Sequence, residues 1–134
     1  MKLGVSYFGN RIPSHYKNHD LPEIQAAGCS YVVHTFSEND LKFYTGTIEK
    51  LIALTRSAGL ESHIDPWGVG GIFGGEAFSE FLILHPDAWQ VRVDGTPVPQ
   101  VCLRSPRFQE FMQNWINTSV TICADMFFWD EPEL

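Results

Sequence analysis

The pattern of apolar and polar positions along the chain predicts four strands. Short apolar runs, some with two-residue alternation, are bounded by glycine, proline or acidic turn residues. Such runs are typical of strands that are buried in a parallel sheet. They occur at residues 2–8, 29–36, 60–64 and 124–129.

Helices are expected between these strands. Asp20 can cap a short first helix that Gly28 ends. Over residues 45–58, apolar side chains recur every three or four positions, which is the spacing of an amphipathic helix. Residues 106–121 have the same spacing and follow Ser105, a good capping residue. Two well-supported helices and one short helix therefore join the strands.

The segment between the third strand and the last helix is expected to be a long, partly ordered excursion. The glycine-rich run 68–75 predicts a flexible connection, and residues 77–84 can form a helical turn or two. The pair Asp94-Gly95 indicates a turn. The glycine-rich run lacks the Lys-Ser/Thr of a phosphate-binding loop.

Strands that alternate with helices predict an α/β fold with parallel strands and right-handed crossovers. We interpret residues 1–134 as a single domain, the (βα)4 half of a TIM-type barrel. The sequence stops just after the fourth strand, where a barrel would continue. We therefore expect the half barrel to be completed by dimerisation or by a C-terminal half that this sequence lacks.

Charge and composition narrow the partners and the compartment. The formal net charge of -7 disfavours nucleic acid and anionic membranes, which bind basic surfaces. A neutral small polar ligand fits better. The start of the sequence does not resemble a signal peptide, and no apolar stretch approaches the length of a membrane span, so a cytoplasmic protein is expected. The three cysteines are interpreted as buried thiols.

Polar and aromatic side chains gather where the predicted strands end. In barrels of this type the carboxyl ends of the strands, and the loops that follow them, carry the chemistry. We therefore take these positions as candidate site residues. They are Tyr7, Asn10, His34, His63, Asp65, Trp67, Trp129, Asp130 and Glu131.

The segment Trp129-Asp-Glu-Pro132 resembles the Asn-Glu-Pro signature that ends strand four in a large clan of barrel glycoside hydrolases, with Asp130 in place of the clan's asparagine. The longer stretch Phe127-Phe-Trp-Asp-Glu-Pro132 is similar to glycosidase-like barrel proteins with a Phe-Leu-Asp-Glu-Pro type strand. The resemblance implies that Glu131 is a general acid/base, with no cofactor required. It also implies a nucleophile on strand seven, beyond the four strands found here.

The residue types suit this chemistry. Glycoside cleavage needs a protonated carboxyl beside the leaving oxygen, and a neighbouring Asp130 would help to keep Glu131 protonated. Tryptophans such as Trp67 and Trp129 can stack on sugar rings. Hydroxyl groups of a carbohydrate can be bound by the polar set Tyr7, Asn10, His34, His63 and Asp65.

Two alternatives remain open. His34, His63, Asp65 and Glu131 are nitrogen and oxygen ligands, so a metal-dependent barrel enzyme is one of them. The other is a non-catalytic half barrel that pairs with a copy of itself, because an open half barrel leaves two sheet edges and an apolar face uncovered. On that basis a homodimer is expected.

Overall fold

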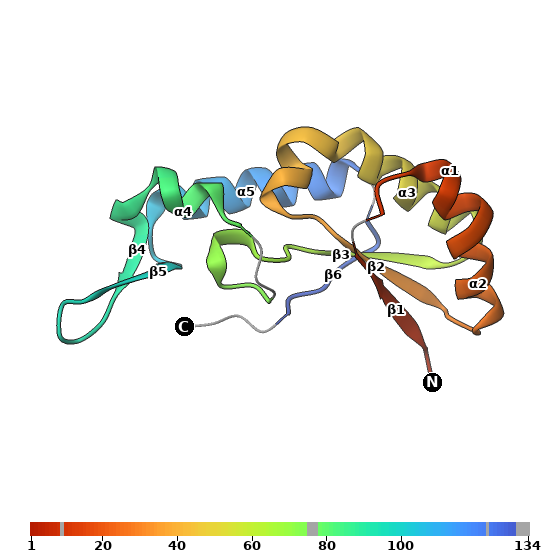
Figure 1. Cartoon of the computed structure of the whole chain (residues 1–134), viewed down its shortest axis with the longest axis horizontal. Coiled ribbons are helices and arrows are strands. Elements are labelled where there is room, and N and C mark those ends of the chain that lie inside the picture. Colours follow the sequence, from red (N-terminus) through yellow and green to blue (C-terminus); the bar gives the residue numbers. More distant parts are fainter. Residues whose placement is uncertain (9, 75–77, 123, 131–134) are drawn as a thin grey trace.

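The computed structural model describes residues 1–8, 10–74, 78–122 and 124–130, and a four-stranded parallel sheet lies at its centre. All neighbouring strands in this sheet are parallel. The α/β prediction is confirmed: this is half of a TIM-like barrel, and the sheet is not closed. The strands, in their order across the sheet, are β1 (Gly4–Tyr7), β2 (Tyr31–Thr35), β3 (Glu61–Asp65) and β6 (Met126–Phe127) (Figure 1).

The connecting helices lie together on one face of the sheet (Figure 1). Two of them are extended at their amino ends by π-helical turns, Tyr16–Asp20 and Asp40–Tyr44. The predicted helices over residues 45–58 and 106–121 are confirmed within one residue at each end. The helices are α1 (Pro13–His15), α2 (Leu21–Ala26), α3 (Thr45–Ser57) and α5 (Pro106–Thr121).

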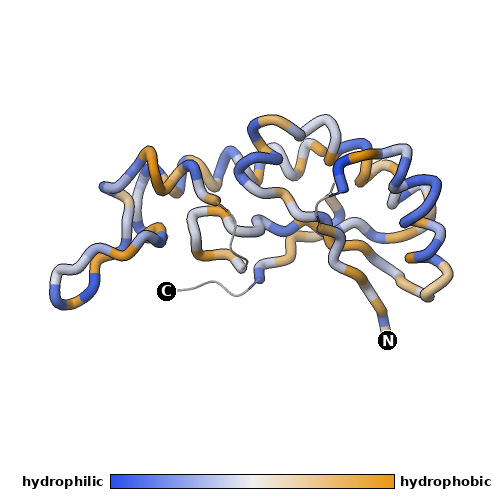
Figure 2. Tube along the Cα trace, viewed as in Figure 1, coloured by the Kyte–Doolittle hydropathy of each residue, from blue (hydrophilic) through white to orange (hydrophobic). Residues whose placement is uncertain are grey.

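The core fills the space between this helical layer and the sheet. Figure 2 shows hydrophobic and hydrophilic positions interspersed along the helices. Buried residues of α2, α3 and α5 contribute to the core, whereas α1 has none. Trp115 of α5 is fully buried, and its indole N–H donates to the carbonyl of Phe36 across 2.8 Å. Ile48, Leu51 and Ile52 of α3 are buried in the same cluster.

The first helical segment differs from its prediction. Asp20 was expected to cap a helix, but it lies inside a continuous helical stretch that begins at Pro13. Proline suits the first turn of a helix because its missing N–H needs no partner there. The carboxylate of Asp20 instead accepts a hydrogen bond from the hydroxyl of Tyr7. Asp20 therefore ties the end of β1 to the helical layer.

The excursion between β3 and α5 is more ordered than expected. It contains the short helix α4 (Glu80–Leu84) and an antiparallel hairpin of β4 (Trp89–Val91) and β5 (Pro97–Val101). The turn predicted at Asp94-Gly95 joins these two strands. The hairpin itself was not predicted, because β4 is only three residues long and β5 contains two prolines.

The glycine-rich run is packed against its surroundings where the structure describes it. Val69 and Gly70 are buried in a 3-10 turn, Val69–Gly71. The backbone φ angle of Gly70 is +64°, and a Cβ there would lie 2.6 Å from a side-chain carbon of Val101. The glycines permit a close approach between this turn and the β5 region, so the expectation of a flexible connection is wrong for residues 68–74.

Two further expectations concern exposure. Cys29 and Cys102 are free thiols of intermediate exposure, so the interpretation as buried thiols is wrong for these two, and Cys123 lies outside the described residues.

Among the helices in the described part of the chain, none combines the length and apolar character needed to cross a membrane.

Candidate functional site

The candidate site residues are divided between the two faces of the sheet. Side chains alternate along a strand, and the parallel register aligns His34 with Ile64 and Thr35 with Asp65. His34 therefore points to the face covered by helices, together with Tyr7, its partner in the register. His63 and Asp65 lie on the opposite face, which we call the open face. Sequence alternation correctly predicts that the last two share a face.

His34 is part of the helix-covered core. It is 1% exposed, and its Nε2 lies 2.8 Å from the hydroxyl of Thr55 on α3. Burial lowers the pKa of the imidazole to about 4, because the charged form loses its hydration. The residue is therefore neutral at physiological pH and links β2 to α3.

Tyr7 and Asn10 meet at Asp20. The hydroxyl of Tyr7 donates to the Asp20 carboxylate, and the amide of Asn10 lies 3.4 Å from the same oxygen. Burial, and then the hydrogen bond with Asp20, raise the pKa of Tyr7 above its ordinary value. Tyr7, Asn10 and His34 also line a small cavity of about 10 Å³. This is the space of about one water molecule, so it has no room for a sugar ring.

On the open face, His63 stacks against Tyr31 of the neighbouring strand. The two rings are nearly parallel, with centroids 4.4 Å apart. Gly4 lies beneath the Tyr31 ring, where a Cβ would overlap the ring atoms. The Nε2 of His63 is 3.5 Å from the carboxylate of Glu61, which also pairs with Lys2. His63 is thus held in place at the middle of β3.

Asp65 ends β3 on the open face and is the most unusual polar group of the set. It is 2% exposed, and its Oδ1 is a buried oxygen without a hydrogen-bond partner in the described part of the chain. Burial, and then the negative charge of Asp130, raise the pKa of this carboxyl to about 6. The carboxyl ends of β3 and β6 therefore bring two acidic groups into electrostatic contact.

The glycine-rich run closes against Asp130. The backbone N–H of Gly74 donates to the carbonyl of Asp130 across 3.2 Å. A Cβ at Gly74 would lie 3.0 Å from Oδ2 of Asp130, so a side chain at this position would crowd the carboxylate. The turn after β3 is thereby attached to the chain that follows β6.

The two candidate tryptophans pack against different aromatic partners. The ring of Trp67 meets that of Phe8 edge to face, with centroids 5.7 Å apart. Trp129 packs near Phe73 and Trp115 at the edge of the core, and it is 43% exposed. Both rings keep accessible surface, which a stacking role requires.

Glu131, the predicted acid/base, lies outside the described residues, so the structure places its neighbour Asp130 and not Glu131 itself. The metal hypothesis has less support, because His34 is on the other face of the sheet from His63 and Asp65. Within residues 1–8, 10–74, 78–122 and 124–130, no three His, Cys, Asp or Glu side chains are grouped so that they could hold a metal ion.

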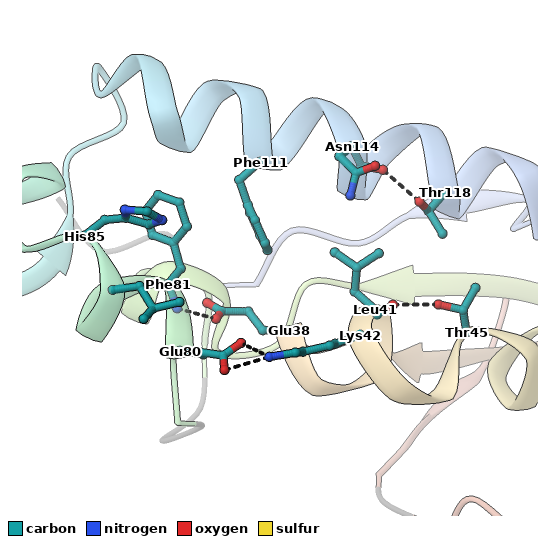
Figure 3. A pocket seen from close by; sticks show the side chains of 11 residues that line it. Glu38, Leu41, Lys42, Thr45, Glu80, Phe81, His85, Phe111, Asn114 and Thr118 are labelled. Atoms are coloured by element: carbon teal, nitrogen blue, oxygen red, sulfur yellow. Dashed lines mark hydrogen bonds and ion pairs between the residues drawn. The ribbon is translucent and has the colours of Figure 1, made fainter.

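A separate cavity of about 440 Å³ lies between α4, α5 and the π-helical turn that precedes α3 (Figure 3). Its lining includes none of the candidate site residues. Glu38, at its floor, accepts hydrogen bonds from the backbone N–H groups of Gly70 and Phe81 and from the hydroxyl of Ser79. Lys42 and Glu80 form an ion pair in the same view (Figure 3).

Sequence reasoning missed Glu38 as a structural residue. Residues 37–40 follow the predicted strand 29–36 and have the polar composition of a turn, whereas Glu38 and Asp40 are both buried. Asp40 accepts hydrogen bonds from the backbone and hydroxyl of Ser37 and pairs with Arg11. The pattern Ser-x-x-Asp is a local capping signal, but the partners of Glu38 are more than 30 residues away in the sequence and leave no such signal.

Comparisons with known proteins bear on the fold. No family model and no curated protein matches the sequence. Among solved structures, the chain is similar to a polyextremophilic β-galactosidase from the Antarctic haloarchaeon Halorubrum lacusprofundi, with a TM-score of 0.61 and 22% identity. The match covers 90% of this chain and 18% of that chain, so the chain spans under a fifth of that enzyme's length. The chain therefore shares its half-barrel fold with part of that enzyme.

Proposed function

We propose that this chain is a carbohydrate-binding, glycoside-hydrolase-like half barrel with its site on the open face, at the carboxyl ends of β3 and β6. The observation that carries the proposal is the buried carboxyl of Asp65, with one oxygen unpartnered among the described residues, in electrostatic contact with Asp130. The fold likeness to a β-galactosidase supports the same conclusion. Perturbed, buried carboxyls at this end of a barrel sheet are typical of functional sites.

In the proposed reaction, Glu131 is the general acid/base that protonates the leaving oxygen of a glycoside. Asp130 contributes a negative charge that favours the protonated form of its neighbour. Asp65 accepts hydrogen bonds from sugar hydroxyls, and Trp67 offers an aromatic face to the sugar ring. Trp129 packs against Trp115 on the helix-covered side, so it borders the proposed site rather than lining it. A second carboxylate is required for hydrolysis. In the clan that the sequence resembles, that carboxylate belongs to strand seven, so it would come from outside these four strands.

Hydrolysis of a chromogenic aryl β-galactoside, together with calorimetric binding of lactose, tests this proposal. Glu131→Gln should abolish any hydrolysis while leaving lactose binding within a fewfold of the parent chain. Glu23→Gln, an exposed change on α2, is the matched control and should alter neither. A chain that neither binds nor cleaves β-galactosides or related glycosides would contradict the proposal.

A second candidate function is self-assembly of the half barrel into a homodimer. Met126 and Phe128 lie on the open face and are 53% and 42% exposed, next to the unpaired edge of β6. Apolar side chains beside an unpaired strand favour association with another chain. We propose that a second copy covers this face when no other partner is present.

Light scattering across a dilution series measures this association. Phe128→Lys places a charge on the open face and should shift a dimer toward the monomer. Val120→Lys, at an exposed position of α5, is the matched control and should leave the mass unchanged. A parent chain that is monomeric at every concentration would rule out the homodimer.

A further inference from the structure

One oxygen of the Asp65 carboxyl, Oδ1, is buried and has no hydrogen-bond partner among the described residues. A buried acceptor without a donor costs free energy, and the cost is largest when the group is charged. Among the described residues, neither oxygen of Asp65 takes part in an ion pair with a lysine, arginine or histidine side chain. Two events can relieve this cost: the carboxyl can take up a proton, or a ligand can donate a hydrogen bond to it.

The charged and titratable groups around Asp65 do not stabilise its ionised form, so proton uptake and ligand binding are the two ways to relieve the cost. From the chain after β6, Asp130 adds a second negative charge. On β3 itself, His63 shares the face but stacks on Tyr31. On β2, the partner in the register is Thr35, which carries no charge. Within the described ranges of the chain, no positive charge is therefore in place to hold Asp65 ionised in the free protein.

We propose that Asp65 couples ligand binding to proton release: a hydroxyl of a neutral polyol donates to Oδ1 of the ionised carboxylate, and binding thereby expels the proton that the free carboxyl holds. This inference rests on the proposed function, because it takes the ligand to be a carbohydrate. The O–H bond of the protonated carboxyl breaks and its proton passes to the solvent buffer. The ligand keeps its own hydroxyl proton and shares it as the hydrogen-bond donor.

Linkage sets the expected size of this coupling. The pKa of free Asp65 is about 6, and a hydrogen bond to the charged form lowers it again in the complex. Affinity for the sugar should then rise about tenfold per pH unit between roughly pH 4 and 6, and level off above this range. The site would therefore bind neutral polyols most tightly above this range, where ionising Asp65 costs little free energy.

Isothermal titration of lactose into the whole chain, in pairs of buffers with different ionisation enthalpies, measures the proton release directly. At pH 5 we expect close to one proton released per lactose bound, and at pH 7.5 close to none. Asp65→Asn should bind with no proton release and without the rise in affinity between pH 4 and 6. Asp94→Asn, an exposed change in the hairpin turn, is the matched control and should behave as the parent chain.

A carboxyl ¹³C titration of the free protein, with the Asp65 signal assigned by its loss in Asp65→Asn, is the second measurement. We expect a midpoint near pH 6 that moves lower in Asp130→Asn. A midpoint below pH 5 overturns the inference, as does lactose binding without proton release at pH 5, and both results leave the proposed function standing. Absence of binding to lactose and related sugars overturns the proposed function, and the inference fails with it.

Discussion

His34 on β2 and Asp65 on β3 lie on opposite faces of one sheet, a single register position apart, and burial favours the uncharged form of both. The helical layer covers the imidazole, whereas the carboxyl lies on the open face. Burial lowers the pKa of His34 to about 4 and raises that of Asp65 to about 6. The two shifts have opposite effects on stability over almost the same pH range.

The first prediction concerns His34. In the unfolded chain a histidine takes up a proton below about pH 6.5, whereas the folded chain resists protonation until about pH 4. Its contribution is therefore complete above pH 6.5 and is lost as the pH falls toward 4, a change on the order of 3 kcal/mol. His34→Gln should remove this loss. Urea unfolding from pH 4 to 7 measures it, and an unchanged acid slope in the variant would contradict the assignment.

The second prediction concerns Asp65, for which the sign is reversed. The folded chain binds this proton more tightly than the unfolded chain, so stability falls as the pH rises from about 3.8 to 6. Asp65→Asn removes the cost of burying the charge and should stabilise the protein at pH 7 by on the order of 3 kcal/mol. The same urea series tests it: the double variant with His34→Gln should show neither slope, and destabilisation of Asp65→Asn at pH 7 would refute the argument.

The third prediction concerns the close approach at Gly70. Its φ of +64° disfavours any other residue, and a Cβ there would lie 2.6 Å from the side chain of Val101 and 2.9 Å from that of Phe108. Gly70→Ala should therefore destabilise the chain by about 2 kcal/mol or more. Gly46→Ala is the control: it lies in α3 with nothing within 4 Å of the added carbon, and it should stabilise by about 0.5 kcal/mol. Thermal unfolding of both variants decides whether the glycine-rich turn is packed as described.

The fourth prediction concerns Trp115, the largest fully buried side chain. Trp115→Ala leaves a cavity under α5 and removes the donor to the carbonyl of Phe36, so a loss of about 3 to 5 kcal/mol is expected. Val120→Ala on the exposed side of the same helix should change stability by no more than about 0.5 kcal/mol. Similar losses in the two variants, measured by denaturant unfolding, would show that α5 does not pack on the sheet through Trp115.

Some features of the candidate site could be predicted from local sequence and others could not. The alternation His63-Ile-Asp65 places two polar groups on one face of any strand, and the structure confirms it. Whether His34 lies on the same face as Asp65 or on the helix-covered face depends on the register between β2 and β3. No local pattern encodes that register. The backbone N–H of Gly70 donates to the carboxylate of Glu38, more than 30 residues earlier in the sequence. Hydrogen bonds of this kind exist only in the folded chain.

The sequence by itself determined the order and type of the main elements. Apolar spacing identifies the strands and the helices α3 and α5, because burial of one face requires a period that can be read along the chain. Tertiary structure alone decided which polar ends of these elements meet. It placed His34 and Tyr7 under the helices, joined Asp65 to the charge of Asp130, and packed the glycine-rich turn against β5. The physical reason is that desolvation and charge interaction depend on distances in space, which neighbours in the sequence do not specify.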